Sequence, residues 1–565
     1  MTRSILSSVA ALGAALTALA PHSALAQRLD YDGGSSAEAG EGDSAPADGD
    51  DAPRRKHTPK ATIAPYLEFQ QIAQVELAPG NEAVTYSVAA AGVDAAIAGR
   101  NNTGSLSLRY ERRFGYGSTR IADADAVSGI ARYSGTIVPR ALTFDAGALA
   151  TRTSVQNNGA GVLSPLAVRD NVTQVYSAYI GPNIATRVGA VAVTGSYRLG
   201  YTKVESPNAP VGPGVDLFGD SVSHMAAVRA ATRAGEVLPV GLALEAGALR
   251  EDVSNLDQRV SDLHVRGDVT LPVGRDLALV GGVGYEKVQI SSRDAVRDGA
   301  GNPVIGSDGR YVTDKSQPRV LAYDVAGLIW DAGVLWRPSK RTALEAHFGR
   351  RYGSTSYFGS FAYAPNSRSS LNVSVYDTVS GFGSTLNNSL AGLSSDFTAL
   401  RNPLTGDIGG CVAAATGNGC YSGAIGSLRS AVFRDRGVMA SYALNLGRVQ
   451  AGVGAGYDQH KFIAAPGTVL AAANGTIDEN TWIAAYLNGR IDRNSSFATN
   501  VRANWFQSGD ALAGDVNAIG ASAAYLRSFG PRLSGTAAVG VDGINRDILA
   551  DQWVASALLG LRYSF

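Results

Sequence analysis

Apolar and polar residues alternate with a period of two in segment after segment between Ala61 and the end of this chain. Leu106 and Leu108 fall on one parity, while Arg109 and Glu111 fall on the other. Successive side chains of a β-strand point to opposite faces, whereas a helix would repeat its apolar residues at intervals of three and four. The pattern therefore predicts an all-β protein whose strands each have one apolar and one polar face.

A globular sandwich and a membrane barrel share this period, so the composition is needed to separate them. Only 17% of the 565 residues are charged, against about 25% in an average chain. No run of about 20 apolar residues follows the N-terminus, which excludes a helical membrane protein. Aromatic residues gather near the ends of the apolar faces, as they do where a barrel wall meets the membrane surface. We therefore expect a transmembrane antiparallel β-barrel of the bacterial outer-membrane type, surrounded by outer-membrane lipid.

The last segment of the chain carries the alternation to its end. Every odd-numbered residue from Trp553 to Phe565 is apolar or aromatic, and Tyr563 lies two residues before the terminal Phe565. This strand resembles the C-terminal assembly signal of bacterial outer-membrane barrels. The resemblance implies that Tyr563 and Phe565 are recognised by the barrel-assembly machinery.

The N-terminus predicts export and divides the chain into three parts. Residues 1–26 have a basic start, a short apolar stretch and an Ala-Leu-Ala cleavage pattern, which indicate a signal peptide; a membrane-anchoring helix is the alternative. Residues 27–60 are rich in Gly, Ser, Pro and Asp, first acidic and then basic, and predict a disordered periplasmic leader. Residues 61–565 form the predicted barrel. The 49 basic and 49 acidic residues balance, which gives no reason to expect nucleic acid as a partner.

Short and long connections alternate along the predicted barrel. Short ones follow near residues 139–140, 273–275, 338–340, 447–448 and 530–532, and longer ones lie near 155–171, 205–219, 293–318, 378–429, 463–480, 507–515 and 544–552. Outer-membrane barrels have short periplasmic turns and long outer loops. With both termini in the periplasm, this predicts an even count of about 20–22 strands. Two outer connections, near residues 79–80 and 353–354, break the rule because they are short.

The two cysteines, Cys411 and Cys420, lie in the longest predicted loop. Two cysteines in one loop of an exported chain predict a disulfide; free thiols and a metal site are the alternatives. No histidine or third cysteine lies near them, and no motif predicts a cofactor or a metal site. The acidic stretch that contains Asp298, Asp308 and Asp314 predicts a solvated loop, with a calcium site as the alternative.

The polar faces of the strands supply the candidate lumen residues. These are Arg109, Glu111, Arg113, Arg198, His264, Arg266, Asp268, Glu345, His347, Arg351, Arg502 and Arg562. Arginines outnumber acids in this set, which favours anionic solutes, although pairing across the lumen would cancel part of the charge. A hydrolase in the barrel wall would need His347 beside a nucleophile such as Ser356 or Ser360, and a network of charges and hydrogen bonds is the simpler expectation.

Two aromatic-rich segments carry a family resemblance. Residues 344–353 (LEAHFGRRYG) and 357–363 (YFGSFAY) resemble the outer-membrane β-barrel family associated with PEP-CTERM/exosortase and exopolysaccharide systems. Residues 108–115 and 171–177 also resemble chains that often bear the label preprotein translocase subunit YajC. That label fits this sequence poorly, because genuine members of that family are small and have one transmembrane helix. The resemblance implies a barrel over most of the chain after residue 61, and it carries no catalytic residues.

The sequence thus predicts a non-enzymatic outer-membrane barrel. The leading hypothesis is a channel or export conduit for polysaccharide or another polar solute, with no substantial plug in the lumen. The alternative is a structural or surface-interaction barrel whose lumen is blocked by side chains and inward-folded loops, with an exposed 378–429 loop. A TonB-type transporter has a similar strand number, but about 34 residues before the barrel are too few for its folded plug.

Overall fold

The computed structural model describes residues 60–116, 124–156, 158–163, 172–206, 216–414, 419–510 and 513–565. The predicted signal peptide, residues 1–26, and the leader up to residue 59 lie outside the described residues. Both therefore stay predictions. Among the residues that the structure describes, no helix has the length and hydropathy needed to cross a membrane.

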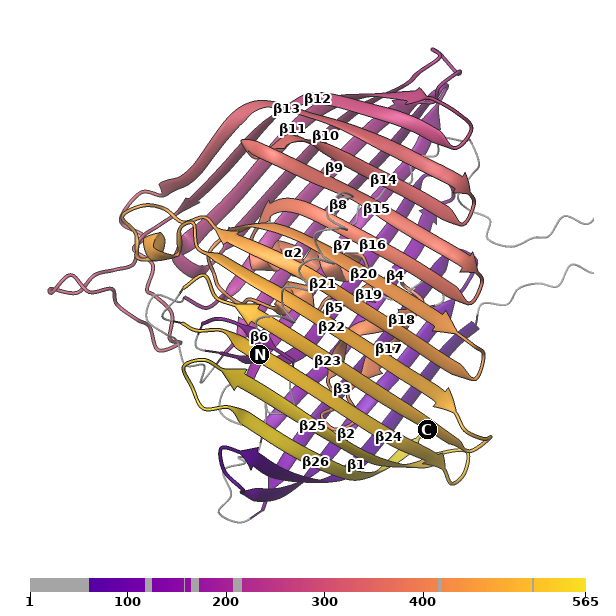
Figure 1. The fold of residues 1–565 in the computed structure, drawn as a ribbon, viewed down its shortest axis with the longest axis vertical. Helices are drawn as coiled ribbons and strands as arrows, with labels where there is room; N and C mark the ends of the chain where they lie inside the picture. Colours follow the sequence, from indigo (N-terminus) through magenta and orange to yellow (C-terminus); the bar gives the residue numbers. More distant parts are fainter. Residues whose placement is uncertain are drawn as a thin grey trace, which may run out of the picture.

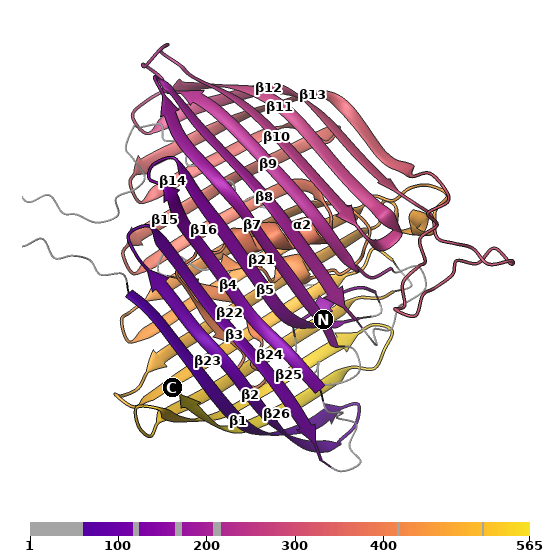
Figure 2. The ribbon, with the colours of Figure 1, turned by 180° about the vertical axis from the view of Figure 1, so that it is seen from behind.

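Twenty-two long antiparallel strands form one closed ring (Figures 1 and 2). Each strand pairs with the next one along the chain, and the first strand, β1, closes the ring against the last, β26, from Tyr66 opposite Ser564 to Ala78 opposite Trp553. A closed ring leaves no unpaired backbone edge, which is the condition for placing a sheet in lipid. The all-β barrel and the strand number agree with the sequence prediction.

The strand bounds define the wall. Its first half comprises β1 (Lys60–Ala78), β2 (Ala83–Ala98), β3 (Asn102–Gly115), β4 (Ala124–Val138), β5 (Leu142–Val155), β7 (Val172–Val188), β8 (Val191–Glu205), β9 (Asp220–Thr232), β10 (Gly241–Val253), β11 (Gln258–Pro272) and β12 (Leu277–Ser292). Its second half comprises β13 (Val320–Ser339), β14 (Thr342–Arg351), β15 (Ser354–Asn366), β16 (Ser369–Ser380), β20 (Phe433–Asn445), β21 (Val449–Phe462), β22 (Ile477–Arg490), β23 (Ser495–Gln507), β24 (Val516–Ser528), β25 (Leu533–Arg546) and β26 (Gln552–Ser564). A two-residue strand, β6 (Gly161–Val162), extends the end of β5.

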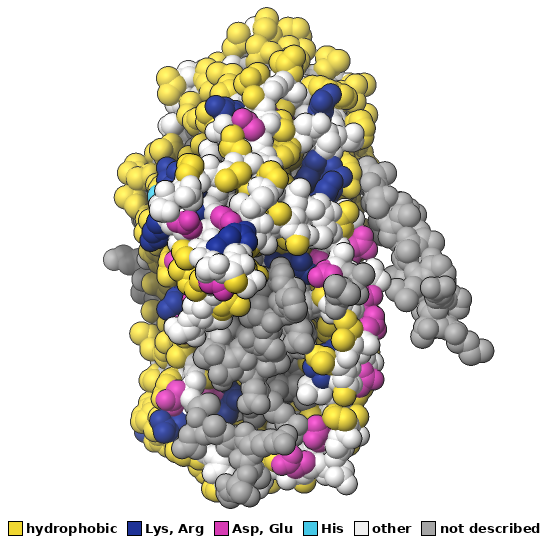
Figure 3. Space-filling model, turned by 90° about the vertical axis from the view of Figure 1, so that its left-hand side faces the viewer, with side chains coloured by type: hydrophobic (Ala, Val, Ile, Leu, Met, Phe, Trp, Pro, Cys, Tyr) yellow, Lys and Arg dark blue, Asp and Glu magenta, His cyan; other side chains and the backbone are white. Residues whose placement is uncertain are grey.

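The two parities of each strand face opposite environments. On β3, the Leu108 side chain is 40% exposed and faces outward, whereas the neighbouring Arg109 side chain is 3% exposed and faces the lumen. On β26, the odd-numbered residues Leu559, Leu561 and Tyr563 all face outward. Seen from the loop end, hydrophobic side chains gather along the outer margin of the barrel, while charged ones lie over the loops (Figure 3). A closed barrel with an apolar outer wall is an outer-membrane barrel.

The connections alternate in length as predicted, except that residues 233–240, between β9 and β10, form a longer connection at the end of the short turns. The short turns lie at the right-hand end of Figure 1, at the same end as the start of β1 and the end of β26, and the longer loops lie at the other end. The structure adds a third short outer connection, residues 254–257 between β10 and β11, which the sequence analysis did not single out. The longest described hairpin, residues 293–319, projects from the loop end, and its Asp298 carboxylate accepts hydrogen bonds from the N–H groups of Ala300 and Asn302.

The expectation of a lumen without a substantial plug is wrong. Residues 381–432, which we call the lumenal segment, fold into the barrel instead of projecting from it as an exposed loop. The segment contains α2 (Phe382–Ala391), the small strands β17 (Phe397–Arg401), β18 (Ile408–Ala414) and β19 (Gly419–Cys420), and the short helix η3 (Gly423–Ile425). Its apolar side chains form one core with inward-facing residues of β4, β5, β7, β8 and β10. Loop length alone did not reveal this direction.

The helix α2 is stabilised by an apolar stripe that packs against apolar side chains on the inner face of the wall. Phe382, Leu386 and Leu390 recur at intervals of four, so they form one apolar stripe. All three are buried against the inner faces of β5 and β7–β9. Apolar side chains buried in this way stabilise the docked segment by about 1.5–3 kcal/mol per side chain.

A charge placed on the outer wall tests the membrane orientation. Leu559 lies mid-strand and is 70% exposed on the outside. We expect Leu559→Arg to destabilise the barrel by about 2–4 kcal/mol, because the guanidinium would enter lipid. Equilibrium unfolding from phospholipid vesicles measures this free energy.

The matched control is Ile305→Arg, at a side chain 61% exposed on the 293–319 hairpin outside the wall. This substitution should change the stability by no more than about 0.5 kcal/mol. Equal effects of the two substitutions would contradict the membrane orientation.

Candidate functional site: the lumen and its inward-folded segment

Arginines on one side of the wall hold the lumenal segment by its backbone. Arg132 on β4 donates to the carbonyl oxygens of Ala391 (3.0 Å) and Leu393 (3.1 Å), just after α2. Arg152 on β5 donates to the Thr405 carbonyl at 2.9 Å and pairs with Asp407 at 2.8 Å. Guanidinium groups suit this task because each offers five donors in a fixed fork.

Two further arginines complete this anchoring. Arg198 on β8 donates to the side-chain oxygen of Asn388 at 2.8 Å. In the opposite direction, Arg401 of the segment donates to the hydroxyls of Ser107 (3.0 Å) and Ser128 (2.8 Å) on β3 and β4. Gly406 has a φ of +71°, and a Cβ there would lie 2.5 Å from Arg109, so only glycine lets the segment approach the wall this closely.

A buried carboxylate holds the start of α2. Glu251 on β10 is fully buried and accepts hydrogen bonds from the backbone N–H groups of Gly381 (2.9 Å) and Ser384 (3.2 Å). The first N–H groups of a helix have no partner within the helix, and the helix dipole favours a negative charge there. The wall thus supplies the cap that the segment lacks.

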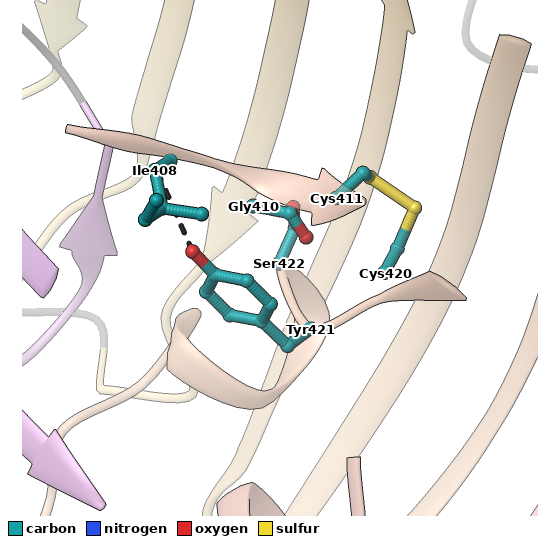
Figure 4. The surroundings of a disulfide bond; sticks show 6 residues. All are labelled: Ile408, Gly410, Cys411, Cys420, Tyr421 and Ser422. Carbon is teal, nitrogen blue, oxygen red and sulfur yellow. Dashed lines mark hydrogen bonds between the residues drawn. A yellow bond between two sulfur atoms is a disulfide. The ribbon is translucent and has the colours of Figure 1, made fainter. Parts of the chain in front are cut away.

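The predicted disulfide is present and joins Cys411 to Cys420 (Figure 4). The two residues are direct partners of the small β18–β19 ladder. Beside them, the Tyr421 hydroxyl donates to the Ile408 carbonyl, and the Ser422 hydroxyl donates to the Gly410 carbonyl at 3.2 Å. The sulfur atoms pack against Trp482 on β22. The disulfide therefore holds together β18, β19 and residues 421–422, which we call the disulfide lobe, without attaching them covalently to the wall.

The opposite side of the wall carries a network rich in carboxylates. Arg229 on β9 lies between Glu245 (2.8 Å) and Asp268 (2.7 Å). Arg266 on β11 lies between Asp268 (2.5 Å) and Asp331 (2.8 Å). These groups sit on adjacent strands because register pairs Glu245 with Arg266 and Ala243 with Asp268. The network contains two of the predicted lumen residues, Arg266 and Asp268, together with their direct partners.

Arg351 and two histidines extend this network. Arg351 pairs with Asp262 (2.9 Å) and Glu286 (3.3 Å), and it contacts a ring nitrogen of His264 at 3.0 Å. The ring of His347 lies between two carboxylates, with Nδ1 2.6 Å from Asp331 and Nε2 3.1 Å from Glu345.

The hydrolase alternative finds no geometry in this network. Both ring nitrogens of His347 already contact carboxylates, so neither is left to activate a hydroxyl. Register places Ser356 opposite Gly349 and Ser360 opposite Glu345, and neither serine lies opposite His347. Among the residues that the structure describes, no cluster of three or more His, Cys, Asp or Glu is arranged to hold a metal ion.

Two cavities remain beside the lumenal segment. One, of about 1520 Å³ including space open to solvent, lies against β9–β16 and contains the charged network. The other, of about 1950 Å³, lies between the disulfide lobe and β15–β22. Both are lined by Ser360, Thr378, Ser380 and Asn388, so they are neighbours along the same side of the lumen.

Loops at the outer mouth contact one another and the end of the lumenal segment. Arg310 of the 293–319 hairpin donates to the carbonyl oxygens of Val204, Leu217 and Phe218. Asp216 accepts hydrogen bonds from the Ser430 hydroxyl (2.9 Å) and from the Asn255 amide. Burial raises the pKa of the Asp216 carboxyl from 3.8 to about 6, against the opposing effect of these donors and of Arg310. The last part of the lumenal segment is thereby held at the mouth.

The other predicted lumen residues also lie inside the barrel. Arg109 pairs with Glu68 (3.2 Å) and with Glu111 (3.4 Å), and Arg113 pairs with the same Glu111 (3.1 Å). Arg502 on β23 pairs with Asp542. Arg562 pairs with Asp94 at 2.8 Å and lies over the ring of Tyr66.

Sequence reasoning missed the residues that hold the lumenal segment. These are Arg132, Arg152, Glu251, Arg401 and Asp407. Strand parity places Arg132, Arg152 and Glu251 on polar faces, so the alternation alone could have identified them as lumen residues. Nothing local indicates their partners, which lie more than 100 residues away in the chain.

No protein-family model matches the chain, and no curated protein matches it in sequence. Solved structures do match. The FrpB iron transporter from Neisseria meningitidis has 11% identity and a TM-score of 0.41, with 88% of this chain and 81% of that chain covered. The closed form of the ferric-catecholate import receptor Fiu from E. coli K12 has 9% identity, a TM-score of 0.42 and the same coverage.

The alcaligin outer-membrane receptor FauA from Bordetella pertussis matches with 10% identity and a TM-score of 0.35, covering 88% of this chain and 76% of that chain. At such low identities and scores, we draw nothing about the function of this chain from these proteins. The conclusions below rest on its own geometry.

The raised pKa of Asp216 predicts a pH dependence of the contacts that hold Ser430 at the outer mouth. The folded protein keeps this carboxyl protonated up to about pH 6, whereas the solvated group ionises near 3.8. Stability from this site is therefore greatest below pH 3.8 and falls by up to about 3 kcal/mol as the pH rises through 6. Hydrogen exchange of the Ser430 amide, which donates to the Asp216 carbonyl, measures the loss after correction for the intrinsic rate.

Asp216→Asn is the control, because asparagine still accepts from Ser430 and does not titrate. Its exchange should show no step between pH 4 and 6 beyond the intrinsic trend. The same step in both proteins would count against Asp216 as its source.

Removal of the disulfide should loosen the segment and spare the wall. We expect Cys411→Ser with Cys420→Ser to lower the stability of the lumenal segment by up to about 3 kcal/mol, because the unfolded segment regains loop entropy. Limited proteolysis should then cut within residues 381–432. Heat-dependent gel mobility should still report a folded barrel, and loss of that mobility shift would contradict the prediction.

Proposed function

We propose that this protein is a restrictive outer-membrane channel for small polar solutes, narrowed by its lumenal segment. The observation that carries the proposal is the pair of neighbouring cavities, of about 1520 and 1950 Å³, left between the segment and β9–β22. Their walls carry ionised side chains, hydroxyls and amides, which suit a hydrated solute. The segment holds the other side of the lumen closed through Arg132, Arg152 and Arg401.

The lumenal segment sets the size of the solute in this proposal. A polysaccharide chain is bulkier than a small polar solute, so in this proposal its export, as the exopolysaccharide resemblance implies, requires the segment to leave its place. The second candidate is a sealed barrel with a structural or surface-interaction role. The contacts that tie residues 426–430 to the loops at the outer mouth favour it.

A segment deletion separates these functions. Ser380 on β16 and Phe433 on β20 are direct register partners, so a two-residue Asn-Gly turn in place of residues 381–432 keeps the hairpin intact. We expect wild-type protein in planar bilayers to conduct weakly and the deletion variant to conduct several-fold more. Liposome swelling with sugars of increasing size should show a higher size limit for the variant.

The matched control shortens only the turn at residues 298–302, between the bridge partners Arg297 and Pro303 of the 293–319 hairpin. This variant should conduct like the wild type, because it keeps Arg310 and its hydrogen bonds at the outer mouth. A silent wild type with a conducting deletion variant would favour the sealed barrel. Silence of both folded proteins would refute the channel.

A further inference from the structure

The charged groups of the lumen are divided between its two sides. On β3–β8, Arg132, Arg152 and Arg198 are used to hold the lumenal segment. On β9–β22, Glu251 and Asp478 also contact the segment, while charged side chains of β9–β11, β14, β20 and β21 line the two cavities. The charge of the cavity lining is therefore set by these strands.

The cavity walls carry more acids than arginines. The carboxylates among the lining residues are Glu245, Asp262, Asp268, Glu345, Asp435 and Asp458, and the guanidinium groups are Arg229, Arg266 and Arg351. This reverses the sequence-based expectation of an arginine excess that favours anions. The reversal arises because several of the predicted arginines lie on other parts of the wall.

Pairing does not cancel this acidic excess. Each of the three arginines lies between two carboxylates, and Asp331 and Glu286 stand behind the lining as second partners of Arg266 and Arg351. The three histidines that face the cavities, His264, His347 and His460, each contact at least one of these acids. With all three histidines charged, the six lining carboxylates match the six cationic groups, and Asp331 and Glu286 behind them leave the whole network with two acids in excess.

The described residues of the lumenal segment add no charge to the lining of the two cavities. Its described residues that line the cavities are Thr385, Asn388, Ser389, Ala391, Gly392, Leu393, Ser394, Gly419, Cys420, Gly423 and Ala424. Gly423 lies close to the wall, since a Cβ there would lie 2.6 Å from the Asp458 carboxylate. The segment therefore narrows the path without adding charges to its lining.

We propose that the path past the lumenal segment is cation-selective, so that the solutes which use it are small cations or polar molecules with a positive group. This inference rests on the proposed channel function. An excess of carboxylates along a narrow, low-dielectric passage raises the local concentration of cations and excludes anions. Glu245 and Glu345 are the best placed to do so, since their side chains are the most exposed of the paired acids in the network, at 28% and 29%.

The reversal potential in a KCl gradient tests this inference. Wild-type protein in a planar bilayer should show a reversal potential that has the same sign as the K⁺ equilibrium potential of the gradient. The double variant Glu245→Gln with Glu345→Gln should shift that potential toward zero. Glu236→Gln is the matched control, because Glu236 pairs with Arg187 at a turn outside the lumen, and it should leave the potential unchanged.

The outcomes separate the two proposals. A folded wild type without current overturns the channel and, with it, the selectivity. Current without selectivity, or with a preference for Cl⁻, overturns only the selectivity. Cation preference that the double variant retains in full shows that Glu245 and Glu345 do not create it. The wild-type measurement decides the main point even if the double variant fails to fold.

Discussion

Closure of the sheet is the constraint on which the rest of this structure depends. In lipid, an unpaired backbone N–H or C=O group costs several kcal/mol, so the first strand must meet the last. The ladder between β1 and β26 does this, with Tyr66 opposite Ser564 at one end and Trp553 at the other. Once the ring is closed, the parity of each strand assigns one side chain to lipid and the next to the lumen.

A ring of this size creates an interior that the wall side chains alone do not fill. The lumenal segment occupies part of it through an apolar core under α2 and through arginines that bind its carbonyl oxygens. Glu251 caps the helix from the wall, so the segment and the wall complete each other's hydrogen bonds. The space left over lies on the side where carboxylates prevail, and this asymmetry connects the packing to the proposed selectivity.

The parts of the site that sequence predicted are those governed by local rules. Parity placed Arg109, His264 and His347 among polar faces, and compartment and spacing predicted the pairing of Cys411 with Cys420. The direction of the loop that contains those cysteines was predicted wrongly, because an inward and an outward loop of equal length look alike in sequence. The anchors Arg132 and Arg152 find their partners about 255 residues away in the chain, and such contacts have no periodic signal.

By itself, the sequence determined the barrel, its approximate strand number and the orientation of its walls, since these follow from a period of two and from the alternation of loop lengths. The tertiary structure decided that residues 381–432 enter the lumen and that carboxylates dominate the space they leave. The physical reason is that the inward fold of the segment and the charge of the remaining space both depend on which strands face each other across the ring. That arrangement is set by closure over the whole chain and not by any local segment.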